Sequence, residues 1–223
     1  MVMNKTELIV MLTYNDKTID KAYETFMRCK DSKADYWGFK EEPLPLEEMK
    51  KLSSIMKFYG KKIAMEVVAY TKEECIEGAK KAVACGCDIL MGTVYCDEVN
   101  EICKQNGMKY CPFVGKLRER PTVLEGDVQE MISQAESYLE KGVYGIDLLG
   151  YRYTGDAKEL IDDFVSGVNA PVCVAGSVNS FERLDEIKRI NPAAFTIGSG
   201  FFDKCFGDDI CQQINTVCEY MES

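Results

Sequence analysis

The stretch APVCVAGSVNSFERLDEIKRINPAAFTIGSGFF, residues 170–202, decides the fold because it repeats one pattern twice. A short β-branched run ends in Gly176-Ser177, and a second apolar run ends in Gly198-Ser199. Between these turns, apolar residues recur on one helical face, from the capping hydroxyl of Ser180 to Asn191-Pro192, which ends a helix. The stretch therefore predicts a strand, a turn, a helix, a strand and a second turn of the same kind.

Both turns place a glycine and a hydroxyl directly after a strand. Glycine lets the main chain approach a ligand closely, and main-chain N–H groups can then bind an oxyanion. In a barrel of eight parallel strands, the turns after the seventh and eighth strands commonly bind phosphate. The sequence therefore predicts phosphate binding by Gly176, Ser177, Gly198 and Ser199, provided that these strands are the seventh and eighth.

The rest of the chain supplies six more units of a strand followed by a helix. The eight strands are expected to begin near Leu8, Asp35, Lys62, Ile89, Lys109, Gly145, Pro171 and Ala194. Strict alternation implies a parallel sheet, and eight units in 223 residues imply a closed barrel. We therefore predict an α/β protein with a single (β/α)8 (TIM) barrel domain over residues 1–223. The alternative is an open doubly wound sheet, whose glycine fingerprint is missing after the first strand.

Three local expectations bear on the site. The fifth strand is expected over residues 110–116, so that it ends at Lys116, and residues 118–126 are expected to form the longest loop. A short helical turn is expected over residues 200–206, and Asp208 is expected to cap the last helix.

The composition is typical of a globular protein, with 46% hydrophobic and 29% charged residues. The net charge of −10 argues against a general nucleic-acid surface and against binding to anionic membranes. No apolar run approaches the roughly 20 residues that span a bilayer, and the N-terminus does not resemble a signal peptide. We expect a cytoplasmic protein without nucleic-acid or membrane partners. The oligomeric state stays open, with a homo-oligomer as one alternative.

The cysteine pattern argues against a metal site. The chain has eleven cysteines and no histidine. The one tight pair, Cys85-Gly-Cys87, has no partner pair at a zinc-ribbon spacing, and most other cysteines lie in apparent amphipathic helices. We therefore expect eleven reduced, unbridged thiols, no metal and no cofactor.

Function in such a barrel is expected at the carboxyl ends of the strands. The polar residues there are Asp16, Lys40, Glu66, Thr93, Lys116, Asp147, Arg152, Ser177 and Ser199. Glu66 and Asp147 stand in strands that are otherwise apolar on both faces. If either carboxylate faced the helices, it would be buried without a partner, at a cost of several kcal/mol. Both are therefore expected to point into the lumen.

Two lysines are candidates for chemistry. Lys40 ends the second strand, beside Glu66 on the third, and the pair either is structural or moves protons and holds an enediolate. Lys116 ends the expected fifth strand, beside Asp147 on the sixth. In an apolar lumen its pKa would fall and it could form a Schiff base; otherwise it is a surface lysine at the rim.

The turns VAGSV (174–178) and TIGS (196–199) resemble those of the ribulose-phosphate-binding barrels. That superfamily includes the phosphoribosyl isomerases of histidine and tryptophan biosynthesis, hexulose-phosphate synthase and related sugar-phosphate decarboxylases. In the histidine-pathway isomerases an aspartate closes the first strand, which the resemblance carries onto Asp16, while Lys116 stands in place of their second aspartate. Class I aldolases of this fold use a barrel lysine, which Lys116 or Lys40 would match.

These observations lead to two functional hypotheses. The first is an enzyme acting on a small phosphorylated sugar or related phosphate ester, as an isomerase, epimerase or carbon–carbon lyase working through an enediolate or a Schiff base. Its candidate catalytic residues are Asp16, Lys40, Glu66, Lys116 and Asp147. The second is a non-enzymatic sensor of a phosphorylated metabolite that acts through a partner, like the similar barrels of glycerol-phosphate-responsive antitermination regulators. Converging charges at the mouth would favour the enzyme, and an exposed apolar patch there would favour the sensor.

Overall fold

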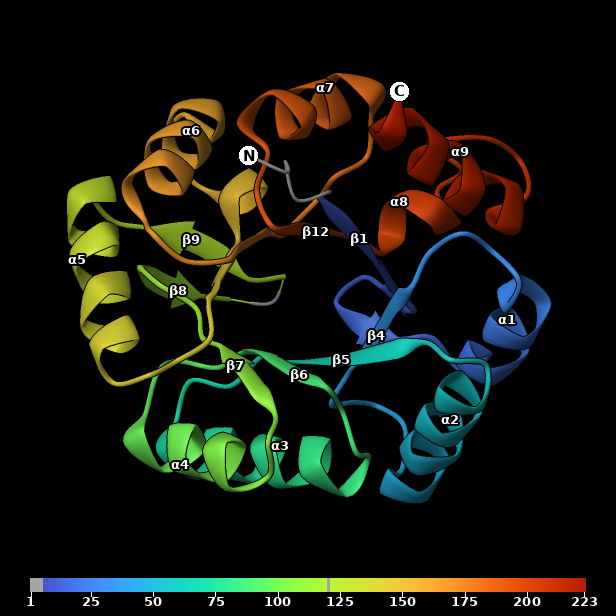
Figure 1. The fold of residues 1–223 in the computed structure, drawn as a ribbon, viewed down its shortest axis with the longest axis horizontal. Helices are drawn as coiled ribbons and strands as arrows, with labels where there is room; N and C mark the ends of the chain where they lie inside the picture. Colours follow the sequence, from blue (N-terminus) through green and yellow to red (C-terminus); the bar gives the residue numbers. More distant parts are fainter. Residues whose placement is uncertain (1–5, 120) are drawn as a thin grey trace.

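The computed structural model describes residues 6–119 and 121–223, which form a ring of eight parallel strands inside a ring of helices (Figure 1). The strands are β1 (Glu7–Met11), β4 (Tyr36–Lys40), β5 (Lys62–Val67), β6 (Ile89–Gly92), β7 (Lys109–Cys111), β10 (Ile146–Leu148), β11 (Val172–Val174) and β12 (Ala194–Ile197). Each begins within one residue of its expected start. The short apolar runs between turn residues therefore predicted the strands correctly.

The barrel closes where the two edge strands of the sheet, β7 and β10, meet. The strand order is β10-β11-β12-β1-β4-β5-β6-β7, with parallel pairing between neighbours. The edge strands β7 and β10 meet through a parallel bridge between Phe113 and Asp147, and the Asp147 N–H donates to the Pro112 carbonyl at 3.0 Å. The predicted (β/α)8 barrel is confirmed, and an open doubly wound sheet is excluded.

Helices cover the outside of the barrel (Figure 1). They are α1 (Ala22–Cys29), α2 (Leu46–Phe58), α3 (Lys72–Ala84), α4 (Asp97–Gln105), α5 (Val128–Glu140), α6 (Ala157–Gly167), α7 (Phe181–Ile190), the short α8 (Ser199–Phe202) and α9 (Ile210–Glu222). Helix α7 is capped by Ser180 and ends at Asn191, as expected. The expected cap at Asp208 is wrong. Helix α9 begins one residue later, and the Asp209 carboxylate accepts from the N–H groups of Cys211 and Gln212, both at 3.0 Å.

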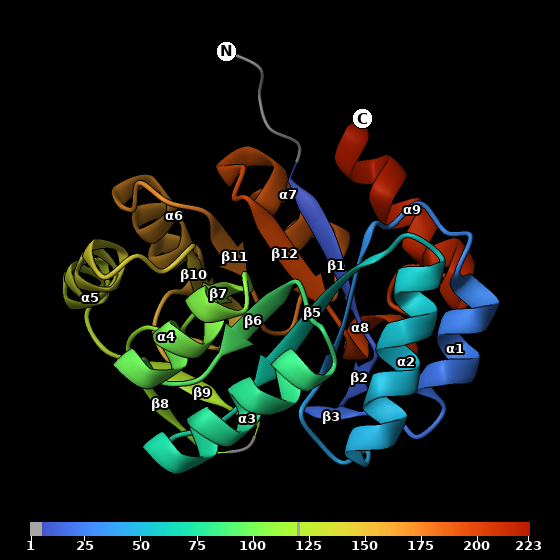
Figure 2. The ribbon, with the colours of Figure 1, turned by 60° about the horizontal axis from the view of Figure 1, so that its bottom comes forward.

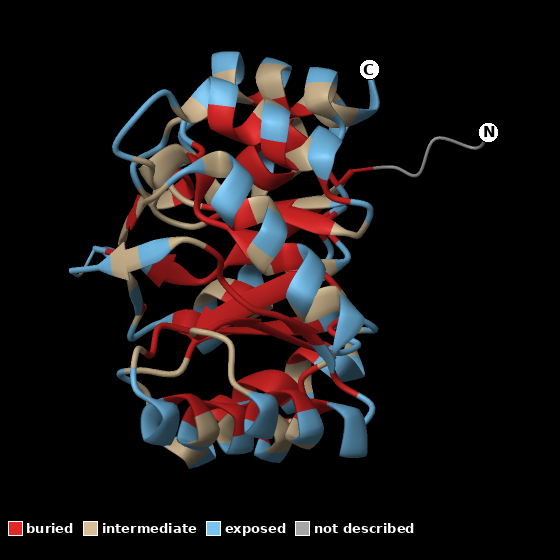
Figure 3. Ribbon diagram, turned by 90° about the vertical axis from the view of Figure 1, so that its left-hand side faces the viewer, coloured by how far each residue is buried: buried red, intermediate tan, exposed pale blue. Residues whose placement is uncertain are grey.

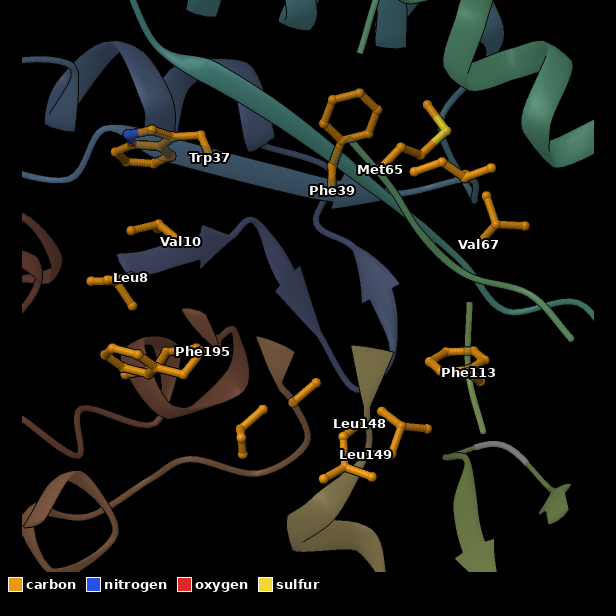
Figure 4. Close-up of a cluster of buried hydrophobic side chains, with 14 of the residues drawn as sticks. Leu8, Val10, Trp37, Phe39, Met65, Val67, Phe113, Leu148, Leu149 and Phe195 are labelled. Atoms are coloured by element: carbon orange, nitrogen blue, oxygen red, sulfur yellow. The ribbon is translucent and has the colours of Figure 1, made fainter. Parts of the chain in front are cut away.

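The core has two layers because alternate residues of a strand point to opposite faces. Residues that point outward, such as Val10, Phe39, Met65 and Phe195, pack beneath the helices (Figure 4). Residues that point inward fill the lumen as a separate cluster of Ile9, Met11, Ala64, Ile89, Met91, Cys111 and Cys173. The burial is concentrated in the strands and the inner helix faces (Figure 3), so the barrel is a filled core rather than a pore.

Two antiparallel hairpins lie at the carboxyl ends of the strands (Figure 2). The first joins β2 (Thr13–Tyr14) to β3 (Lys17–Thr18), and the second joins β8 (Lys116–Arg118) to β9 (Val123–Glu125). The expected strand over residues 110–116 is therefore wrong. Pro112 has no N–H for the ladder, and Gly115, with φ of +79°, turns the chain out of the barrel. The expected loop over residues 118–126 belongs largely to this second hairpin, apart from residue 120, which lies outside the described residues.

One pair of cysteines corrects the expectation of eleven unbridged thiols. Cys29 on α1 and Cys211 on α9 form a disulfide with a Cα–Cα distance of 5.0 Å, although they lie 182 residues apart. Closure of the barrel brings the last helix against the first, which no local spacing reveals. The other nine cysteines, all in the described part of the chain, are free.

Residues 6–119 and 121–223 contain no group of three His, Cys, Asp or Glu side chains that could hold a metal ion. Within the same ranges, no helix combines the length and the apolar character that crossing a membrane requires.

Candidate functional site

A cavity at the barrel mouth brings together most of the predicted site residues. Its lining includes the charged side chains of Asp16, Lys40, Glu66 and Arg152, and the two turns with Gly176, Ser177, Gly198 and Ser199. The cavity measures about 70 Å³. Small-molecule sites typically measure roughly 300–1,000 Å³, so this cavity is small in the structure. Thr122 of the β8–β9 hairpin is buried, and its N–H donates to Asp16 at the edge of the cavity.

Asp16 is the hub of the charged side chains. It occupies, with Asn15, the two central positions of the β2–β3 turn, at φ of 63° and 48°, which is the type I′ geometry favoured in hairpins. Its Oδ1 accepts from Arg152 Nη2 at 2.8 Å and from Lys40 Nζ at 3.1 Å. Its Oδ2 accepts from Arg152 Nη1 at 2.7 Å and from the Thr122 N–H at 3.1 Å. Burial alone would raise the pKa of Asp16, but Arg152 and Lys40 hold it well below its usual value.

Lys40 links Asp16 to Glu66. Lys40 and Glu66 are paired positions on β4 and β5, and Lys40 Nζ lies 3.4 Å from Glu66 Oε2. Burial would lower the pKa of Lys40, yet the charges of Glu66 and Asp16 raise it above its ordinary value. Lys40 is therefore a protonated ammonium group. Arg152, Asp16, Lys40 and Glu66 form a row of alternating charge, which we call the charged row.

Asp147 lies deeper in the lumen, beside Cys173 of the neighbouring strand and outside the lining of the cavity. It is completely buried, and neither carboxyl oxygen has a hydrogen-bond partner among the described residues. Burial raises the pKa of Asp147 well above its usual value, and the charge of Glu66 raises it further. Asp147 points inward, as expected.

The turns after β11 and β12 line the cavity together, as expected of the seventh and eighth barrel strands. Within the described ranges, no group accepts a hydrogen bond from the main-chain N–H of Ser177, Gly198, Ser199 or Gly200. Ser177 is exposed, Gly198 and Ser199 are half-buried and Gly200 is buried, so these N–H groups are left to water or to a ligand. These four donors are free to bind an anion in the cavity.

Lys116 is not brought into the cavity. It is exposed on β8, where it pairs with Glu125 across the hairpin, and it is separated from Asp147 because the barrel strand has already ended at Cys111. Two residues of the site were not among the predicted catalytic or phosphate-binding residues. Arg152 belonged to the set of polar strand ends, and Thr122 stood in the segment expected to be a loop. Nothing local pointed to their shared partner Asp16, which is 136 residues before Arg152 in the sequence.

Comparisons with known proteins agree with this architecture. No family model matches the chain, and no curated protein shows significant similarity to it. Among solved structures, a 4-hydroxy-2-oxoglutarate/2-dehydro-3-deoxyphosphogluconate aldolase matches with a TM-score of 0.67 and 13% identity, over 99% of this chain and 96% of that one. N-acetylmannosamine-6-phosphate 2-epimerase from Clostridium perfringens matches with a TM-score of 0.64 and 12% identity, over 89% and 88%.

A third structure, phosphoribosylanthranilate isomerase from Thermotoga maritima, matches with a TM-score of 0.62 and 15% identity, over 98% of this chain and 99% of that one. At such identities the matches concern the fold. They span almost the whole of both chains and agree with the strand count and the closed barrel. The chain therefore has the (β/α)8 barrel fold of these solved structures.

Proposed function

We propose that the protein is an enzyme acting on a small phosphorylated sugar or a related phosphate ester bound at the barrel mouth. One observation carries the proposal. The cavity that is lined by four unpartnered N–H donors is also lined by the charged row of Arg152, Asp16, Lys40 and Glu66. The N–H donors suit a phosphate, and the charged row suits proton transfer beside that phosphate.

The two turns supply the phosphate site in this proposal. The N–H groups of Ser177, Gly198, Ser199 and Gly200 have no competing acceptor in the described part of the chain. A phosphate dianion would accept charge-assisted hydrogen bonds from them, which are about twice as strong as neutral ones.

Isomerisation, epimerisation or carbon–carbon lysis through an enediolate fits the charged row better than a Schiff base. A Schiff base needs a neutral amine, but Lys40 stays protonated between Asp16 and Glu66. Lys116 is exposed and lies outside the cavity. In our proposal Glu66 takes the substrate proton, and the Lys40 ammonium stabilises the negative oxygen that forms.

The converging charges also favour an enzyme over a sensor. A sensor needs affinity and a means of reaching its partner, and neither requires a carboxylate and an ammonium group side by side in a small cavity. The Lys40–Glu66 pair is buried on both sides, with 4% and 10% of the side chains exposed. Burying such a pair costs free energy, which a catalytic role would explain.

The proposal is tested by separating binding from turnover. Phosphorylated sugars are first screened by thermal shift, since a ligand at 100 times Kd stabilises by about 2.7 kcal/mol. With a ligand found in this way, Ser177→Asp should abolish binding, because it sets a carboxylate against the phosphate. Ser133→Asp adds the same charge on the exposed face of α5 and should leave binding unchanged.

Glu66→Gln is the second arm of the test. It should keep the ligand affinity within a few-fold and lower turnover by about 10²–10⁴, the usual contribution of a general base. Glu136→Gln, the same change at an exposed position of α5, is its control. Unchanged affinity in Ser177→Asp would refute the phosphate site. Unchanged turnover in folded Glu66→Gln, or loss of folding alone, would refute the role of Glu66.

A further inference from the structure

The guanidinium group of Arg152 has one occupied edge and one free edge. Its two terminal nitrogens, Nη1 and Nη2, both donate to Asp16, at 2.7 and 2.8 Å. A guanidinium group carries five N–H donors in a planar fork, and an end-on pair of this kind leaves the edge that contains Nε available. Across residues 6–119 and 121–223, no acceptor lies within hydrogen-bond reach of the Arg152 Nε–H.

The Arg152 side chain lies against the turn after the seventh barrel strand, with Cγ, Cδ and Nε next to Gly176. A Cβ atom on Gly176 would lie 2.8 Å from Arg152 Cγ, 3.2 Å from Cδ and 3.4 Å from Nε. The arginine therefore occupies the space that a side chain at position 176 would fill. Both residues line the cavity that receives the unpartnered N–H groups of Ser177, Gly198 and Ser199. The unused donor of Arg152 and the unused main-chain donors thus belong to one cavity.

Asp16 keeps Arg152 in this orientation. The Arg152 side chain is 21% exposed and that of Asp16 is 8% exposed, so solvent screens the pair weakly. Thr122 contacts both, because its N–H donates to Asp16 and its carbonyl accepts from Arg152 Nη1 at 3.5 Å. With Asp16 fixed by Lys40 from the other side, the guanidinium plane has little freedom to turn.

We propose that Arg152 is a positioning residue that binds the phosphate of the ligand through its Nε edge while its terminal nitrogens keep hold of Asp16. The inference rests on the proposed function and adds a side-chain ligand to the main-chain phosphate site. One rigid guanidinium group then sets the distance between the phosphate and the charged row. The recognised ligand class is a phosphate monoester whose reacting carbon lies next to Lys40 and Glu66.

The test uses inorganic phosphate and the whole chain. Phosphate is titrated into the protein while the side-chain Nε–Hε signal of Arg152 is followed by ¹H–¹⁵N NMR. We expect this signal to move downfield and to saturate at the phosphate concentration that calorimetry gives for binding. Arg152→Lys keeps the charge but lacks the planar fork, and should weaken phosphate binding about tenfold. Arg189→Lys makes the same change in an exposed ion pair with Asp162 and should leave the affinity unchanged.

The outcomes separate this inference from the proposed function. If phosphate binds, and Ser177→Asp abolishes binding, but the Arg152 signal stays still and Arg152→Lys binds within twofold of the wild type, the inference is overturned and the proposed function stands. If no binding sensitive to Ser177→Asp occurs, the proposed function fails, and the inference fails with it. Should Arg152→Lys not fold by circular dichroism, the titration of the wild-type Arg152 signal decides alone.

Discussion

Lys40 and Glu66 occupy directly paired positions on neighbouring barrel strands, and the ammonium nitrogen of Lys40 lies 3.4 Å from the Glu66 carboxylate. The register of β4 and β5 holds this pair, so its geometry belongs to the rigid sheet. The second acid on Lys40, Asp16, comes instead from the tip of a hairpin. In the charged row, Lys40 and Glu66 are therefore held by the sheet, whereas Asp16 is held by a hairpin turn.

Lys40→Met should be strongly destabilising, because it leaves Asp16 and Glu66 buried without their shared cation. Breaking one partner out of a buried pair typically costs about 3–5 kcal/mol of unfolding free energy. Urea denaturation at pH 7 measures this loss of unfolding free energy. Lys50→Met is the matched control, since Lys50 pairs with Glu47 on the exposed side of α2 and should change stability by less than about 1 kcal/mol. Equal effects of the two variants would contradict the buried pair.

Asp16 should contribute to the unfolding free energy at neutral pH, and this contribution should be lost in acid. Its pKa is lowered in the folded state, so below its ordinary pKa near 3.8 the unfolded chain binds more protons. The unfolding free energy should therefore be fully present above about pH 4 and fall as the pH drops further. Asp16→Asn should flatten this part of the curve, and Asp162→Asn, in an exposed ion pair, should not. A wild-type slope in Asp16→Asn would show that other carboxylates carry the acid dependence.

Asp147→Leu should stabilise the protein. The buried carboxyl has no hydrogen-bond partner among the described residues, and an apolar side chain of similar size removes that cost, about 1–3 kcal/mol. Because the pKa of Asp147 is raised in the folded state, the wild type should lose stability as the pH rises above about 4, and Asp147→Leu should lose less. Asp163→Leu, exposed on α6, should change stability by less than about 0.5 kcal/mol. Destabilisation by Asp147→Leu would mean that the carboxyl group has a partner.

Gly176→Ala should cost more than another glycine substitution at the same type of backbone position. Gly176 has φ of +85° and Gly107 has φ of +64°, so alanine is strained at both. Only at position 176 would the new Cβ meet Arg152, at 2.8 Å, whereas nothing lies within 4 Å of it at Gly107. The difference in unfolding free energy between the two variants therefore isolates the contact with Arg152. Equal losses of unfolding free energy in the two variants would show that the Arg152 side chain moves aside at no cost.

Reduction of the disulfide should lower the melting temperature. Cys29–Cys211 closes a loop of 182 residues, and a disulfide typically contributes about 2–4 kcal/mol, with more expected for long loops. Cys29→Ser should reproduce the effect of dithiothreitol and make the protein insensitive to it. Cys205→Ser, at a half-buried free cysteine, should leave both the melting temperature and the response to dithiothreitol unchanged. A wild type that melts at the same temperature with and without reductant would contradict the cross-link.

Local patterns in the sequence were enough to predict the barrel and its inward-facing acids. The strand starts followed from apolar runs bounded by turn residues. The inward direction of Glu66 and Asp147 followed from the cost of burying a carboxylate against the helices. Lys40 and Glu66 could be paired because consecutive strands of the chain are neighbours in the sheet.

The rest depends on contacts between distant parts of the chain. The Asp16–Arg152 pair joins the first hairpin to the segment after the sixth barrel strand, and Cys29–Cys211 joins the first helix to the last. No periodicity carries that information. The position of Lys116 was missed for a local reason, since Pro112 and Gly115 end the barrel strand earlier than its apolar run suggests.

The disulfide also determines how the barrel responds to mechanical load. It joins α1 to α9, and the strands from β4 to β12 all lie between its two cysteines in the sequence. A pulling force applied at Thr6 and Glu222 would pass through the S–S bond and bypass that loop. Tension would fall on β1, the β2–β3 hairpin and α1 before Cys29 and on α9 after Cys211, and the loop that contains Lys40, Glu66 and Arg152 would remain unstretched until the bond is reduced.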